Sequence, residues 1–157
     1  MPTLADQVAA LSDEEAVAAL ALVLERQGQK VDPFAWQQDE PKLRQALTQP
    51  DLTQVATPEP AASQGEVART ALAYLAEQDD TRGLVERAIA VRPRADRFDP
   101  ATLAVGALVL MAFHAEIKLE RDPAKGWSFR FHTRPLKDST IGKLLGQLMG
   151  VYQNPTQ

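Results

Sequence analysis

Side chains suited to catalysis are few and scattered in this chain of 157 residues. There are two histidines, His114 and His132, and no cysteine, which excludes disulfides and zinc–thiolate sites. A metal ion would need carboxylates such as Glu116 or Glu120 beside a histidine, but the ligand spacing typical of zinc enzymes is absent. We therefore expect no metal site and no cofactor.

Nucleophilic catalysis is equally poorly supported, because a serine nucleophile needs a base held beside it. Ser128 and Ser139 are the serines near a histidine in the sequence. Ser139 is better explained as a helix cap, and Ser128 as a solvent-facing strand position. The adjacent acids Asp79 and Asp80 lie at a helix break, where capping accounts for them. We expect a non-enzymatic protein, and a small enzyme without a recognisable motif is the third choice.

Basic side chains gather in the second half of the chain. Residues 1–64 hold four basic and ten acidic side chains (−6), and residues 65–157 hold thirteen and eleven (+2). From Arg82 to Lys143 the count is twelve against seven (+5). If these cations converged they would neutralise phosphates, so a nucleic-acid-binding accessory protein is the alternative function. The acidic pI near 5.2 and the predicted burial of the aromatic residues favour a protein partner instead.

The central element of the chain is an apolar run that predicts a buried helix over residues 100–113. Asp99 is a favoured N-cap and Pro100 suits the first helical position. No charge then appears until Glu116, and a helix that is apolar on all sides must be enclosed on all sides. A membrane span would need about 20 apolar residues, so the run is too short for one.

A β-hairpin over residues 115–134 is predicted to follow this helix. Apolar and charged residues alternate from Ala115 to Arg121 and again from Trp127 to Arg134, around a connection that contains Asp, Pro and Gly. Its aromatic face should pack on the preceding helix. A two-stranded sheet has two open edges, which must be covered or paired with another chain. A homodimer that joins two hairpins would close one edge of each.

The basic side chains beside this module give the predicted contact face. Arg130, His132 and Arg134 should lie on the polar side of the second strand, and Arg94 and Arg97 precede the central helix. We expect these five residues to contact a protein partner or a second copy of the chain.

The remaining sequence divides into a helical N-terminal unit (1–48), a linker or surface loop (49–64) and an α+β domain (65–152). Thr3 and Ser12 are expected helix caps, and Gly28 is an expected helix terminator. Asp32 and Pro33 open a short helix that carries Phe34 and Trp36, and a second helical piece is expected over 41–47. Prolines at 50, 58 and 60 mark the linker.

Three further helices are expected after the linker. Capping-box spacing at Ser63 and a break at Asp79 predict an antiparallel helical hairpin. Ser139 should cap the last helix, with Ile141, Leu144, Leu145 and Leu148 on its apolar face, and Gly150 should end it. A G-x-x-x-G spacing at Gly142 and Gly146 indicates close packing.

The order of these elements from Phe98 to Gly150 resembles that of small uncharacterised bacterial accessory proteins encoded beside effector genes of conflict systems. The resemblance implies an accessory or adaptor part and brings no catalytic residue with it. The sequence thus predicts a mostly α, α+β protein. We expect a cytoplasmic, non-enzymatic interaction or adaptor module that self-associates, since the N-terminus lacks the pattern of a secretory signal.

Overall fold

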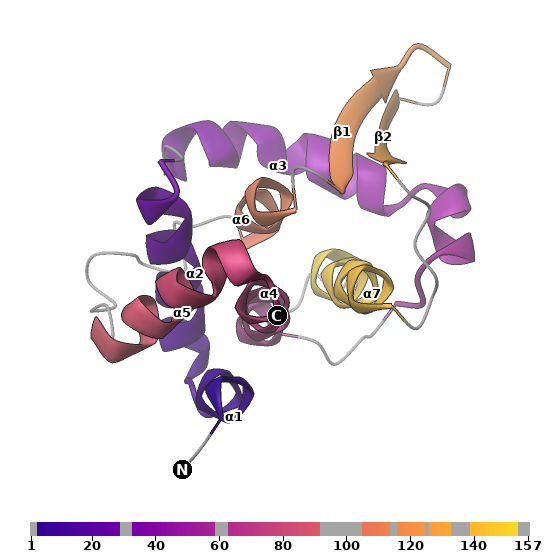
Figure 1. The fold of residues 1–157 in the computed structure, drawn as a ribbon. Helices are drawn as coiled ribbons and strands as arrows, with labels where there is room; N and C mark the ends of the chain where they lie inside the picture. Colours follow the sequence, from indigo (N-terminus) through magenta and orange to yellow (C-terminus); the bar gives the residue numbers. More distant parts are fainter. Residues whose placement is uncertain are drawn as a thin grey trace.

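Helices pack together and a short hairpin projects from them in the computed structural model, which describes residues 3–28, 33–58, 63–91, 105–113, 116–124, 126–132 and 139–153 (Figure 1). In chain order the elements are α1 (Leu4–Ala9), α2 (Asp13–Arg26), α3 (Pro33–Leu47), the 3-10 helix η1 (Pro50–Gln54), α4 (Gln64–Glu77), α5 (Asp79–Val91), α6 (Val105–Ala112), β1 (Ile117–Asp122), β2 (Gly126–Phe131) and α7 (Thr140–Gln153). The predicted α+β, mostly helical class is confirmed.

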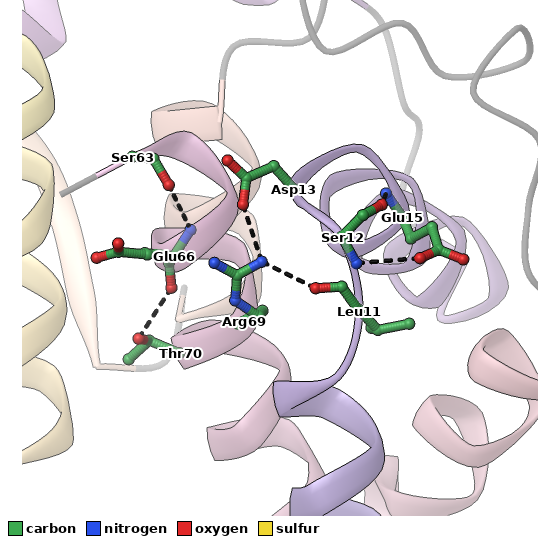
Figure 2. Close-up of polar contacts among 8 residues, drawn as sticks. All are labelled: Leu11, Ser12, Asp13, Glu15, Ser63, Glu66, Arg69 and Thr70. Carbon is green, nitrogen blue, oxygen red and sulfur yellow. Dashed lines mark hydrogen bonds and ion pairs between the residues drawn. The ribbon is translucent and has the colours of Figure 1, made fainter.

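Helix starts follow the predicted capping residues. Thr3 accepts a hydrogen bond from the Asp6 N–H at 3.1 Å, and the Asp6 carboxylate accepts one from the Thr3 N–H at 3.2 Å. Ser12 and Glu15 make the same reciprocal pair at the start of α2. Ser63 Oγ accepts from the Glu66 N–H at 3.2 Å (Figure 2). These contacts bind N–H groups that have no partner within a helix.

Helix α2 is enclosed on every side over most of its length. All nine side chains from Ala16 to Leu24 are buried, and none exceeds 4% exposure. Charged residues are confined to its two ends. Gly28 has φ +89°, so it follows the helix in the left-handed conformation expected of a terminator.

Helix α4 is the hub of the helical packing, since it contacts α1, α2, α5, α6 and α7. The guanidinium of Arg69 ties α4 to the start of α2. Its Nη1 donates to the carbonyl of Leu11 at 3.0 Å and lies 2.9 Å from Asp13 Oδ1 (Figure 2). The N-terminal helices therefore dock directly on the rest of the chain.

Helix α3 corrects the prediction of two separate helical pieces. It runs unbroken from Pro33 to Leu47 with Pro41 inside it. Proline removes one backbone hydrogen bond, but the lost bond does not end a helix that packing holds. Leu43, Ala46 and Leu47 are buried after the proline, and α3 contacts α6, α7 and β2.

Three apolar residues between 50 and 56 pack into the core, although we expected the segment 49–64 to be a linker or surface loop. Leu52 is 4% exposed, Val55 3% and Ala56 fully buried. The η1 turn orients these apolar residues inward, and it begins at Pro50, where proline is tolerated. Residues 59–62 of the expected linker lie outside the described ranges.

Helices α4 and α5 do not form the expected antiparallel hairpin. Gln78 alone joins them, in an extended conformation with ψ 132°. Helical hairpins use loops of about two to five residues, so one residue is too short to reverse the chain. Figure 1 shows α4 end on and α5 from the side. The predicted apolar faces are nevertheless buried at Val67, Ala71, Leu72 and Leu75 in α4 and at Val85, Ala88 and Ile89 in α5.

The central helix and the last helix agree with the sequence in part. Leu108, Val109 and Phe113 are buried in and beside α6, while residues 100–104 of the predicted helix lie outside the described ranges. Ser139 caps α7, because its Oγ accepts from the Gly142 N–H at 3.1 Å. The expected stop at Gly150 is wrong, since α7 continues to Gln153.

Gly146 marks a close approach between α7 and the segment after η1. A Cβ at this position would overlap the carbonyl oxygen of Thr57, a backbone atom that cannot rotate aside as the end of a side chain can. Gly146→Ala should therefore lower the free energy of unfolding by about 3 kcal/mol in urea denaturation. Gly83→Ala is the matched control, because no atom lies within 4 Å of its Cβ position in α5. It should raise stability by about 0.5–1 kcal/mol, and equal effects of the two changes would contradict the packing argument.

Candidate interaction surface on the hairpin

The predicted hairpin is confirmed, with β1 and β2 antiparallel and Lys118 opposite Arg130. The connection is built as its residue types indicate. Asp122 Oδ1 accepts from the Ala124 N–H at 2.8 Å, an Asx turn. Gly126 has φ +83°, which only glycine adopts without strain, and it lies against Gln45 of α3.

The apolar face of the hairpin packs mainly on α3, rather than on the preceding helix as expected. Lys42 of α3 places its ammonium 5.0 Å from the ring centroid of Trp127. Phe129 and Phe131 are partly buried against the core, and Ile117 is 3% exposed. Helix α6 touches β1 as well, but β2 has the larger contact with α3. The alternation correctly predicted which residues form the aromatic face, but the helix on which this face mainly packs is α3 and not the predicted preceding helix.

The polar face of the hairpin forms a shallow groove of about 300 Å³. Its charged lining alternates in sign along β1, with Glu116, Lys118 and Glu120 on one side and Arg130 and His132 on the other. Glu120 Oε1 lies 3.2 Å from Arg130 Nη1 and 3.9 Å from Lys118 Nζ. The strand register places Lys118 opposite Arg130, and the carboxylate of Glu120 offsets the repulsion between these two cations.

The base of the groove is joined to the core through Glu116. The N–H of Ile117 donates to the carbonyl of Phe113 at 2.8 Å, and the N–H of His132 donates to the carbonyl of Glu116 at 3.0 Å. The Tyr74 hydroxyl of α4 donates to the Glu116 carboxylate, and the Tyr74 ring lies 4.4 Å from that of Phe113. The hairpin thus starts from a firm attachment to the hub helix.

The structure brings together two of the five predicted contact residues. Arg130 and His132 are exposed neighbours on the groove. Arg94, Arg97 and Arg134 lie outside the described ranges. The carboxylates and Lys118 were missed as part of this surface, although the alternation on β1 had already placed them on one face.

Cations elsewhere in the described ranges also make intramolecular contacts. Arg82 Nε donates to the carbonyl of Ala76 at 3.0 Å, and Arg69 is bound to the start of α2. The described residues contain no group of three or more histidines and acids that could hold a metal ion. Within the same ranges, no helix has both the length and the apolarity that crossing a membrane requires.

Comparison of the chain with protein-family models, with curated proteins and with solved structures gave no significant match.

The contact of Tyr74, which is partly buried, with Glu116 makes the free energy of unfolding fall at alkaline pH. Burial raises the pKa of Tyr74 above its ordinary 10.0, and the carboxylates of Glu116 and Glu77 add to this effect. The unfolded chain then loses the tyrosine proton at lower pH than the folded chain. This group therefore lowers the free energy of unfolding as pH rises above 10.0.

Tyr74→Phe should remove this alkaline pH dependence. It should also lower the free energy of unfolding by about 1 kcal/mol near neutral pH, because a hydrogen bond is lost. Urea denaturation at several pH values measures both effects. If the difference between the two proteins stays constant through the alkaline range, the tyrosine is not the titrating group.

Proposed function

We propose that this protein is a non-enzymatic interaction or adaptor module that self-associates through the edge of its hairpin. The observation that carries the proposal is the outer edge of β1. In the described part of the chain, β2 is the only strand paired with β1. An open edge presents backbone N–H and C=O groups to any strand that aligns with it.

The way in which the hairpin is attached to the helices suits it to this role. Its turn projects past the helices (Figure 1), while its base is held by Tyr74 and Phe113. A strand presented in a fixed orientation loses less conformational freedom on binding than a mobile one. The hairpin therefore combines a base that is held by the helices with an exposed strand edge, and this combination favours a recognition surface.

The polar groove supports recognition of a strand more than it supports catalysis. Its charged groups are exposed or partly exposed, and Glu120 forms ion pairs with Arg130 and Lys118. A catalytic group would be expected in an enclosed pocket with a strongly perturbed pKa. Alternating charges along an edge instead fix the register of a partner strand.

The proposal extends to cytoplasmic residence and to an accessory role beside a bacterial effector system. Support for that role comes from the element order of residues 98–150, which resembles such accessory proteins. An adaptor needs surfaces rather than a reaction centre, and the hairpin edge provides one.

Arg121 allows a test that separates backbone from side chain. The N–H of residue 121 points away from β2, because hydrogen-bonded pairs alternate along the ladder from the pair 116 and 132, and the side chain is exposed. Arg121→Pro removes this N–H at an edge position, where proline is tolerated. Arg121→Thr removes the same side chain but keeps the N–H and suits a strand.

We expect sedimentation over a wide concentration range to show association of the unmodified chain. Arg121→Pro should weaken it about tenfold or more, and Arg121→Thr should weaken it much less. A monomer at every concentration, or equal effects of the two substitutions, would count against association through the hairpin edge.

A further inference from the structure

The hydrogen bonds at the base of the hairpin establish which backbone groups of β1 point outward. His132 donates to Glu116, so residues 116 and 132 form a hydrogen-bonded pair. In an antiparallel ladder such pairs alternate, so 118 and 120 also bond to β2. Residues 117, 119 and 121 therefore direct their N–H and C=O away from β2. The N–H of Ile117 agrees with this, since it donates to Phe113 instead.

The outer edge of β1 is the edge that a strand can approach. Strand β2 lies against α3, with Gly126 beside Gln45 and Trp127 beneath Lys42. Strand β1 touches α6 through fewer residues, and Lys118 and Arg121 are exposed along it. A new strand added to β1 would extend the groove face into a wider sheet.

Two copies of β1 can pair about a two-fold axis in only a few registers. The axis must pass through one residue, which then lies opposite itself in the second copy. An axis at 118 places Lys118 opposite Lys118, and an axis at 120 places Glu120 opposite Glu120. An axis at Leu119 places Lys118 opposite Glu120 of the second copy, and the symmetric contact repeats this pair. Opposite charges directly across a ladder stabilise it, and like charges destabilise it.

The same register uses the backbone groups that point outward. Leu119 would exchange two hydrogen bonds with Leu119 of the second copy. The N–H of Arg121 would donate to the carbonyl of Ile117 in the second copy, which gives two more by symmetry. The N–H of Ile117 stays with Phe113, so no bond within the chain is broken.

We propose that two copies of this chain pair antiparallel through β1, on an axis at Leu119, to form a continuous four-stranded sheet. The inference rests on the proposed function, because it specifies the register of the association proposed there. On the apolar face, Leu119 would meet its own copy, and the methylene stem of Arg121 would cover Ile117.

Charge exchange at two positions tests the register. Lys118→Glu places like charges opposite each other in both symmetric pairs, and so does Glu120→Lys. Each variant alone should dissociate about tenfold more readily than the unmodified chain. An equimolar mixture of the two should form a mixed dimer, because every facing pair is then of opposite charge. A chain that carries both substitutions should regain self-association.

Circular dichroism and thermal unfolding of each variant control for folding, since Glu120 also contacts Arg130 within the chain. A cysteine introduced by Leu119→Cys gives an independent readout in a chain without cysteines. It would lie opposite itself at the Cα separation of about 5.5 Å that suits a disulfide. Ser128→Cys on β2 is the matched control and should cross-link far less.

The outcomes separate the register from the function it rests on. If Arg121→Pro weakens association but the charge variants and their mixture behave like the unmodified chain, this register is wrong and the hairpin edge remains the contact. If Arg121→Pro also has no specific effect, both proposals fall. Recovery in the mixture and in the doubly substituted chain, with cross-linking at 119, supports the register.

Discussion

Close packing of α2 against α4 is the contact on which the rest of the structure depends. Both helices are rich in small residues at the contact, and a Cβ on Gly65 would overlap the side chain of Asp13. Small side chains allow two backbones to approach closely and exclude water from the space between them. With α2 seated in this way, the other faces of α4 are available to α1, α5, α6 and α7. The N-terminal helices thus act as one wall of the core.

This arrangement explains how a short hairpin can be held firmly. A two-stranded sheet is marginally stable in water by itself. Here Tyr74 extends from the hub helix to Glu116, and Phe113 packs beside the tyrosine ring. On the other side α3 supports β2 through Lys42 and Gln45. The hairpin therefore inherits its order from the helical core, and at its outer edge the N–H of Ile117 is bound within the chain by the carbonyl of Phe113.

Local signals in the sequence predicted most elements, because their causes are local. Capping residues at Thr3, Ser12, Ser63 and Ser139 bind the first N–H groups of their own helices. Alternation of apolar and charged residues predicted both strands and the composition of each face. The same alternation placed Arg130 and His132 on the polar side of the second strand, where both line the groove in the structure.

The errors concern properties that only tertiary packing decides. Pro41 lies inside a continuous helix, and α7 passes through Gly150. Packing of the buried residues Leu43 and Leu47 after the proline, and of Leu148 and Met149 before the glycine, outweighs these local helix-breaking tendencies. The buried residues Leu52, Val55 and Ala56, in and after η1, show no periodicity in the sequence that indicates burial. The uncharged run from Ala16 to Leu24 meets the same criterion as residues 101–113, so the burial of this helix on all sides could also have been predicted. Which helix forms the hub depends on neighbours far away in sequence.

The charges along β1 explain how an exposed strand edge can still be selective for its partner strand. Exposed strand edges aggregate, and proteins commonly prevent this with a lysine on the edge. Lys118 is such a residue, yet Glu120 lies two positions along the same face, 3.9 Å from its ammonium. Strands of arbitrary sequence would leave one of these charges without a counterpart, so most alignments are disfavoured. A strand that offers an acid and a base in reversed order would meet opposite charges, and β1 itself is such a strand. In the proposed register, the same two side chains would therefore disfavour most partners and fit a second copy of this chain.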